Sequence, residues 1–332
     1  MAENTSTNPT LLDLAKVKDP DGSIAAVVEI LNQQNEVLPD MSWREGNLTT
    51  GHKTTVRTGL PAPTWRKLGG GVQPTKATTA QITFGTGMLE NYNEVDKALA
   101  DLDNNTAAFR LSQSRPTIEG INKEMADTLF YGNETSEPEA FTGLSPMFNS
   151  LTADNKENII EGGGTGTDNG SIWLIVWSPE TVFGIVPKGS TAGLTVRDLG
   201  EVTVENVDGS NGRMQAYRTH FRWDAGLAVP DWRFVVRIAN IDKSAIVKDA
   251  ATGADLPDLM FQAIEQVPNL SMGRAAFYMS RTMRTWVRRQ SADKVKNATL
   301  TIEQVGGVPV MFFHGVPLRR VDALAADEAR VV

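Results

Sequence analysis

The fold of this chain is decided by residues 214–241, which read MQAYRTHFRWDAGLAVPDWRFVVRIANI. Between positions 217 and 229 the odd positions hold mostly aromatic and aliphatic residues, and the even positions hold Arg218, His220, Arg222 and Asp224. A period of two predicts an extended strand with one face in a core and the other in a polar setting. Pro230 and Asp231 predict a turn, after which the alternation resumes with Arg233 and Arg237 on its polar side. We therefore predict two long strands that form a sheet with an aromatic face and an arginine face.

The arginine face of this predicted sheet has two interpretations. A strand pair of this kind, taken alone, is usually an ordinary amphipathic sheet whose polar face meets water. The functional alternative is that the arginines meet other subunits of an assembly. The pattern by itself does not separate the two.

The composition limits the class of protein. The chain has 332 residues, with 32 basic and 40 acidic side chains and a net charge of −8. This length allows two or three ordinary domains or one elaborate domain, and the acidic balance excludes a nucleic-acid binder of the basic kind. No apolar run reaches the ~20 residues of a membrane helix, and the polar residues 1–20 lack the apolar segment of a secretory signal. The absence of cysteine excludes disulfides, a thiolate nucleophile and zinc–thiolate sites.

Residues 47–87 are rich in threonine, glycine, lysine and arginine and poor in large aliphatic residues. A weak alternation over residues 52–58 and a return strand over 77–84 flank a middle part that is punctuated by glycine and proline. We predict a long extended hairpin with few core residues of its own. Such a segment buries little surface by itself and needs a partner to hold it.

Residues 106–131 predict one long helix, or two helices with a kink at Pro116. Its apolar residues recur at helical spacing and are Leu111, Ile118, Ile121, Met125 and Leu129. Gly132 supplies a stop signal. Further along, the continuous apolar run 172–177 predicts a strand that is buried on both faces.

Shorter patterns predict the remaining elements. Helices are expected over residues 24–31 after the cap Ser23, over 94–102, from Ser178–Pro179–Glu180 onward, and after the cap Asp255. Strands are expected over residues 202–207, 275–279, 299–302, 309–313 and 316–321. Another helix places Arg281, Arg284 and Arg288 on one face. We expect that face to be solvated or intersubunit, because no aromatic platform for nucleic acid accompanies it.

No pattern in the chain predicts catalysis, a cofactor or a metal. The three histidines, His52, His220 and His314, have no partner at ligand spacing, and the motifs of zinc proteases, serine hydrolases and nucleotide-binding loops are absent. We therefore do not expect an enzyme, although a hydrolase with a distributed site stays open. The main alternative is a soluble carbohydrate- or peptide-binding protein that uses its seven tryptophans. The predicted burial of Trp173, Trp177, Trp223 and Trp232 argues against it.

Several short strings, in a fixed order, carry a resemblance to a known family. They are TLFYGN (128–133), FTGL (141–144), WLIVWSP (173–179), VPKGS (186–190), DLGE (198–201), GLAV (226–229) and RIANI (237–241). With the order of the predicted parts, they resemble the major capsid proteins of tailed double-stranded-DNA bacteriophages of the Hong Kong 97 type. The resemblance is greatest to short-tailed phages of the epsilon-fifteen and Bordetella phage kind. Related chains often carry an aromatic residue where this chain has Val186.

The resemblance implies an α+β, Hong Kong 97-like capsid fold in four parts. An N-terminal arm would occupy residues 1–46, and an extended hairpin, the E-loop, residues 47–90. A peripheral domain with a long spine helix and a long sheet would occupy 91–133 and 206–254. An axial domain would occupy 134–205 and 255–332.

The resemblance also implies a function. Such a protein self-assembles as pentamers and hexamers into the icosahedral shell that encloses the phage double-stranded DNA, and the shell is assembled in the host bacterial cytoplasm. The implied partners are other copies of the chain, a decoration or cement protein, a scaffolding protein and a portal. Packaged DNA would be in nonspecific contact, and no membrane or cofactor would be involved.

The residues expected to contact other subunits fall into three groups. On the hairpin they are Lys53, Arg57, Trp65, Arg66 and Lys67. On the predicted sheet they are Arg218, Arg222, Arg233 and Arg237, and on the later helix they are Arg281, Arg284 and Arg288.

Overall fold

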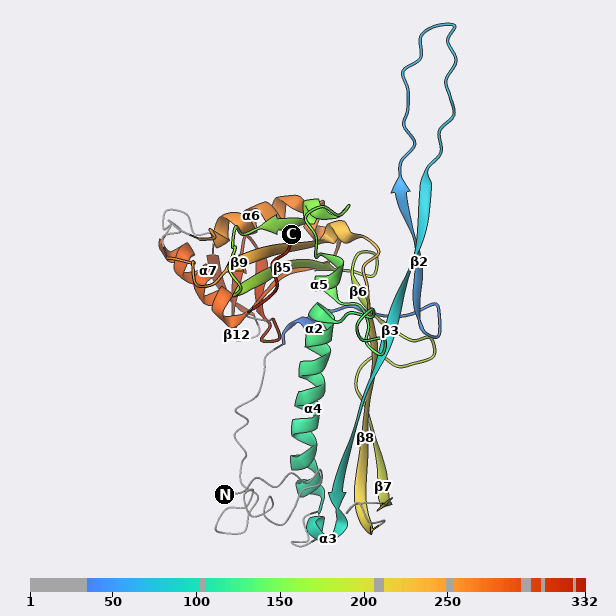
Figure 1. Cartoon of the computed structure of the whole chain (residues 1–332), viewed down its shortest axis with the longest axis vertical. Helices are drawn as coiled ribbons and strands as arrows, with labels where there is room; N and C mark the ends of the chain where they lie inside the picture. Colours follow the sequence, from blue (N-terminus) through green and yellow to red (C-terminus); the bar gives the residue numbers. More distant parts are fainter. Residues whose placement is uncertain are drawn as a thin grey trace. The chain divides into compact units, whose positions relative to one another are not determined.

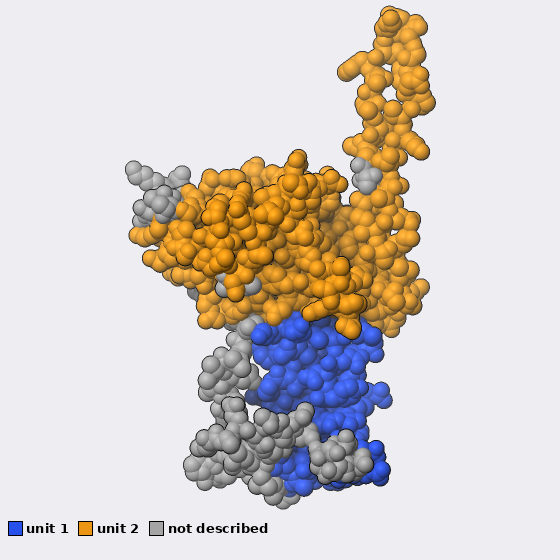
Figure 2. Space-filling view, in the orientation of Figure 1, with its two compact units in different colours: residues 1–33, 88–125, 193–224 blue, residues 34–87, 126–192, 225–332 orange. Residues whose placement is uncertain are grey.

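In the computed structural model of the chain, the described residues are 35–101, 106–205, 212–248, 253–293, 300–305, 308–324 and 327–332. They fall into two units (Figure 2), which are treated separately below. Unit 1 contains residues 88–125 and 193–224, and unit 2 contains the other described residues. The helix predicted over residues 24–31 lies outside the described residues, as does most of the predicted arm.

The structure combines helices and strands, as the predicted α+β class requires (Figure 1). The helices are α2 (Val37–Asp40), α3 (Lys97–Ala100), α4 (Thr106–Tyr131), α5 (Leu144–Met147), α6 (Leu256–Gln266) and α7 (Arg281–Asp293), with 3-10 turns η1 (Lys156–Asn158), η2 (Trp232–Phe234) and η3 (Leu270–Met272). The strands are β1 (Trp43–Glu45), β2 (Gly51–Gly59), β3 (Thr78–Asp96), β4 (Ile159–Glu161), β5 (Asn169–Trp177), β6 (Phe183–Val186), β7 (Thr195–Glu205), β8 (Arg213–Ala228), β9 (Val235–Asp242), β10 (Arg274–Met279), β11 (Leu300–Val305), β12 (Val308–Phe313) and β13 (Val316–Arg320).

The predicted hairpin is confirmed. β2 and β3 pair antiparallel from Gly51 and Gly85 to Gly59 and Thr78, and residues 60–77 connect them. Both strands belong to a six-stranded sheet of order β1-β6-β8-β3-β2, in which β7 also pairs with β8. β2 is therefore an edge strand, and β3 continues past the hairpin to Asp96.

The long helix is also confirmed, since α4 runs without a break through Pro116. The stripe is not entirely as predicted: Ile121, Met125 and Leu129 are buried, but Leu111 is 57% exposed. Gly132 ends the helix, and its amide donates to the Thr128 carbonyl over 2.9 Å. A Cβ at Gly132 would lie 2.5 Å from the Phe141 carbonyl oxygen, so only glycine fits this close approach.

The main core of unit 2 surrounds a seven-stranded sheet of order β11-β12-β13-β10-β5-β9-β4. Every residue of β5 is buried, as the continuous apolar run predicts. α6 and α7 supply Met260, Ala263, Met283 and Val287 to the same core. Asp255 caps α6 as predicted, because its side chain accepts from the Asp258 amide.

A buried ion pair joins several segments of unit 2. Arg237 on β9 is 2% exposed, and its Nη2 lies 2.7 Å from Oε2 of Glu328, a residue near the end of the chain. Arg237 also donates to Ser171 Oγ and to the Phe148 carbonyl, and its guanidinium lies 5.0 Å from the Trp173 ring centre. The second Glu328 oxygen accepts from the Tyr131 hydroxyl at the end of α4 over 2.7 Å. The pair therefore ties β9, β5, α4 and the chain end together.

The predicted pairing of the two strands in residues 214–241 is wrong. β8 pairs with β6 and β7, whereas β9 pairs with β5 and β4 in the other sheet. The 3-10 turn η2, after Pro230 and Asp231, separates them. The alternation near Arg237 misleads because β9 is buried on both faces, and Glu328 neutralises the arginine there.

One predicted helix is replaced by other structure and another is shorter than predicted. Ser178 begins a turn that leads into β6, because the Thr181 hydroxyl donates to the Val176 carbonyl and the Ser178 amide to the Val182 carbonyl. The helix predicted over 94–102 is shorter: β3 extends to Asp96, whose side chain caps α3 by accepting from the Ala98 amide. The later strands predicted near 275–279, 299–302, 309–313 and 316–321 are confirmed as β10 to β13.

The buried pair predicts a large effect of truncation. We expect Arg237→Ala to lower the free energy of unfolding by about 3–5 kcal/mol, because Glu328 keeps a buried charge without its counter-ion. The measurement is urea unfolding followed by tryptophan fluorescence.

Arg233→Ala is the matched control. Arg233 pairs with Asp231 at 2.7 Å, but its side chain is 58% exposed, so we expect a change below about 1 kcal/mol. Equal effects of the two variants would contradict the role given to the buried pair.

Candidate intersubunit surface

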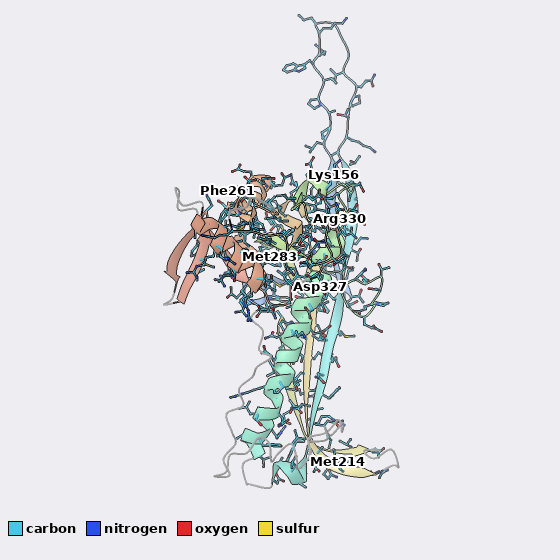
Figure 3. All side chains as sticks on the ribbon, turned by 60° about the vertical axis from the view of Figure 1, so that its left-hand side comes forward. Lys156, Met214, Phe261, Met283, Asp327 and Arg330 are labelled. Carbon is cyan, nitrogen blue, oxygen red and sulfur yellow. The ribbon has the colours of Figure 1, made fainter. Side chains whose placement is uncertain are left out.

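The hairpin tip carries large apolar side chains in full contact with solvent. Trp65 and Leu68 are fully exposed and Leu60 is 77% exposed. The tip keeps its form with few bonds of its own: the Gly70 amide donates to the Lys67 carbonyl, and Thr75 Oγ1 donates to the Ala62 carbonyl. Figure 3 shows the side chains of this tip standing away from other parts of the chain. Exposed tryptophan and leucine of this kind mark an interaction site.

Three basic residues of the hairpin have no acidic partner among the described residues. Arg66, Lys67 and Lys53 are exposed, and none of them forms an ion pair in the described part of the chain. The backbone at Lys53 is held by the Asn47 side chain, which bonds both its amide and its carbonyl over 2.7 Å. Arg57 lies in β2 opposite Thr79, and its side chain is outside the described set.

In unit 1 the arginine face of β8 is paired within the chain. Arg218 Nε donates to Glu94 Oε1 over 2.6 Å, and Arg222 lies 2.8 Å from Asp224 and 3.4 Å from Glu90. His220 lies 3.1 Å from Glu90, and its ring stacks on Tyr92 with centres 4.5 Å apart. Strand β3 thus supplies acids to the arginines of β8. Arg222 and Tyr92 keep exposed surface that could meet a neighbour.

The opposite side of the unit 1 sheet is held by α3 and α4. Arg110 on α4 lies 2.6 Å from Asp198 on β7, and its guanidinium lies 4.9 Å from the Tyr217 ring centre. The Arg110 hydrogen bond lowers the pKa of the Asp198 carboxyl, and the Gly200 amide adds to this effect. Val95, Leu99 and Phe109 form a small apolar cluster against Tyr217.

The remaining predicted contact residues are dispersed. Arg237 is buried and satisfied inside its own unit, so we do not retain it as an intersubunit contact. Arg233 is exposed and bonded to Asp231. On α7, Arg281 is exposed and lies 3.2 Å from Asp322, Arg284 is half-buried and Arg288 is exposed.

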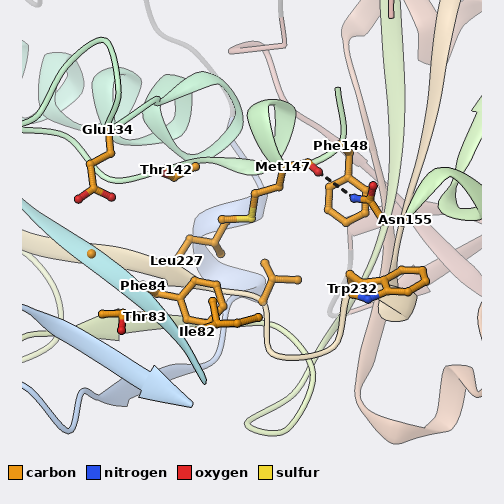
Figure 4. A pocket seen from close by; sticks show the side chains of 12 residues that line it. Ile82, Thr83, Phe84, Glu134, Thr142, Met147, Phe148, Asn155, Leu227 and Trp232 are labelled. Atoms are coloured by element: carbon orange, nitrogen blue, oxygen red, sulfur yellow. Dashed lines mark hydrogen bonds between the residues drawn. The ribbon is translucent and has the colours of Figure 1, made fainter. Parts of the chain in front are cut away.

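A pocket of about 380 Å³ lies in unit 2 near the base of the hairpin (Figure 4). Its apolar lining comes from β3, from the segment around α5 and from the end of β8 with the turn that follows, and the residues are Ile82, Phe84, Met147, Phe148, Leu227, Val229 and Trp232. Glu134 lies at one end of it, and Asn155 Nδ2 is occupied by a bond to the Met147 carbonyl. No pattern in the sequence predicts this pocket.

The other function classes gain no support from the described residues. No group of three His, Asp or Glu side chains in that part of the chain could hold a metal ion. Trp173, Trp177 and Trp223 are buried, as predicted, and cannot line a carbohydrate cleft. The predicted burial of Trp232 is wrong, because this residue is only partly buried and lines the pocket. None of the described helices is long and apolar enough to cross a membrane.

Comparison with protein families gives a match over residues 19–332 to the family described as Major capsid protein GP7. The chain belongs to this family. It is a phage capsid subunit, and the predicted Hong Kong 97-like class is confirmed. A chain in the cryo-electron-microscopy structure of bacteriophage Epsilon15 is 38% identical, with full coverage of both chains and a TM-score of 0.78.

More distant solved structures include capsids. The bacteriophage JBD30 capsid is 9% identical, covers 89% of this chain and 93% of that chain, and has a TM-score of 0.48. The capsid of a native GTA particle is 9% identical, with coverage of 68% and 95% and a TM-score of 0.46. Both similarities are too low to carry an argument. Comparison with curated proteins gives no match.

The acidic partners of the capsid protein's arginines are not among the residues predicted from the sequence. Met88, Glu90, Tyr92 and Glu94 alternate on β3, a period of two that could have extended the predicted strand beyond the hairpin. Glu328 gives no such signal, because its partner Arg237 is 91 residues away.

The arginines of β8 and the basic residues of the hairpin tip are expected to differ in their effect on the stability of the isolated capsid subunit. We expect Arg218→Ala to lower the free energy of unfolding by about 1–3 kcal/mol, because a half-buried charged hydrogen bond to Glu94 is lost. We expect the double variant Arg66→Ala/Lys67→Ala to stay within about 0.5 kcal/mol of the parent. Urea unfolding of unassembled subunits measures both, and a destabilised tip variant would show that the tip supports its own fold.

Proposed function

We propose that this chain self-assembles as pentamers and hexamers into the icosahedral shell that encloses the phage double-stranded DNA, and that it has no catalytic activity. The observation that carries the proposal is the hairpin of a capsid-family chain, whose fully exposed Trp65 and Leu68 have no cover in their own subunit. Exposed apolar surface of this size is stabilised when another subunit covers it. Many modest contacts of this kind then add up in a closed shell.

We propose that the net charge of −8 limits the grip of the shell on its DNA. A strongly basic inner wall would bind phosphates tightly and in a salt-dependent way. An acidic subunit with paired arginines, such as Arg218 and Arg222, leaves few free cations for this. The contact with packaged DNA would then be nonspecific.

We propose further partners and parts on the basis of the family alone. Assembly would take place in the host bacterial cytoplasm, with a scaffolding protein, a portal and a cement protein as the additional partners. The proposed division of the chain into structural parts is an N-terminal arm (1–46), an E-loop (47–90), a peripheral domain and an axial domain. In the described residues, β9 pairs with β5 within unit 2.

The first test is electron microscopy of the purified chain, combined with sedimentation velocity. We expect closed shells, or rings of five or six subunits, whose amount grows with protein concentration. A strictly monomeric protein at high concentration, alone and with its phage partners, would contradict the proposal and return attention to the binding-protein alternative.

The second test removes the hairpin tip. Replacing residues 60–77 by Asn-Gly joins Gly59 to Thr78, which are already paired, through a turn that suits a hairpin. We expect a folded subunit with unchanged circular dichroism that forms no closed shells. Residues 82–85 are kept because they line the pocket in the subunit body. Closed shells from this variant would show that the tip is not needed for assembly.

A further inference from the structure

The pocket at the base of the hairpin and the tip of the hairpin have complementary character. The pocket is lined mainly by apolar side chains, among them Phe84, Met147 and Leu227, and is open to solvent. The tip presents Trp65 with its whole ring exposed, followed directly by Arg66 and Lys67. An aromatic side chain that fills an apolar pocket is the commonest kind of anchor in a protein interface.

The charges beside the pocket match those beside Trp65. Glu134 and Glu139, here called the acidic edge, are exposed and form no ion pair with any described residue. The edge runs along β3: a Cβ at Gly85 would lie 3.2 Å from the Glu134 carboxylate, and one at Gly87 would lie 2.8 Å from the Glu139 carbonyl oxygen. Acids without a cation thus flank the pocket, and cations without an acid flank Trp65.

The tip of a subunit cannot fill the pocket of the same subunit. Phe84 lines the pocket, and the strand rises by about 20 Å from Phe84 back to Thr78, at ~3.3 Å per residue. Trp65 lies farther out still, beyond the last paired residues Gly59 and Thr78. The antiparallel pairing of β2 with β3 keeps this part of the hairpin extended. A hairpin tip that fills this pocket must therefore belong to another copy of the chain.

We propose that Trp65 of one copy inserts into this pocket of a neighbouring copy, with Arg66 and Lys67 against the acidic edge. This inference rests on the proposed shell function and names the contact that would carry it. The contact joins two different surfaces, so each subunit gives a tip and receives one. Repetition of such a head-to-tail contact closes into a ring when the rotation fits, as pentamers and hexamers require.

Disulfide trapping tests the contact directly, because the chain contains no cysteine. The variant Lys67→Cys/Glu134→Cys keeps Trp65 and places one thiol beside it at the tip and one at the pocket lining. In assembled particles, mild oxidation should convert most chains into covalent dimers and higher multimers up to rings on a nonreducing gel. Each single variant should give at most a dimer, because it carries one thiol.

The matched control keeps the tip thiol and moves the second one. Lys67→Cys/Met272→Cys uses an exposed methionine of unit 2 that lies on η3, outside the pocket lining. It should give no ladder of multimers. A ladder in the control, or none in the pocket pair from particles that do form shells, overturns the inference while the shell function stands. Failure of every variant and of the parent to assemble overturns both.

Substitution at the tip gives a second readout. Trp65→Ala should raise the protein concentration needed for assembly by about tenfold or more, whereas Leu60→Ala, on the same hairpin, should change it less than threefold. Lys67→Glu should also weaken assembly, and Glu134→Lys in the same chain should restore part of the loss. Equal effects of Trp65→Ala and Leu60→Ala, with no rescue by the charge exchange, would contradict the insertion of Trp65.

Discussion

The buried ion pair of Arg237 and Glu328 is the constraint on which the larger unit depends. A charge without its partner would be costly at a site where the side chains are 3% and 5% exposed, so the two must fold together. This requirement brings the end of the chain onto β9, the strand next to the edge strand β4 of its sheet. Asn240 repeats the connection nearby, since its amide group bonds both the amide and the carbonyl of Val331 over 2.8 Å. The last residues are thereby built into the core that β5 and β9 form.

The basic residues of the chain fall into two groups, which differ in where their acidic partners lie. One group stabilises the folded subunit, and the other is available for assembly. Arg237, Arg218 and Arg110 find carboxylates in their own unit and hold strands and helices in register. Arg66 and Lys67 find none among the described residues and stand beside exposed apolar groups. A subunit that keeps these two roles apart can reach its folded state before it meets a neighbour. Free basic groups at the tip then add charge selectivity to an apolar contact.

The sequence predicted those features that depend on local periodicity and failed where a distant partner decides. The apolar run 172–177 and the helix 106–131 follow from their own residues. A period of two specifies which face of a strand is buried but not which strand lies beside it, so β8 and β9 were assigned to one sheet. Ser178 has the residue type of a helix cap, but no helix follows it. The Thr181 hydroxyl donates to the Val176 carbonyl instead, and this bond turns the chain into β6. The pocket was out of reach because its lining comes from segments far apart along the chain.

The hairpin also has to avoid indiscriminate pairing. β2 is the edge strand of its sheet, and an edge with free amides and carbonyls can pair with any other strand. Its sequence, GHKTTVRTG, places a lysine and an arginine along this edge and has a single large aliphatic residue. Charged edge residues oppose edge-to-edge pairing, because burying them without partners costs free energy. The apolar groups lie instead at the tip, where Gly69 with φ of 78° turns the chain and only a shaped, acidic-edged surface can accept them. The specificity of such an assembly has two sources: edge-to-edge pairing of strands is unfavourable, and the contact between tip and pocket is favourable.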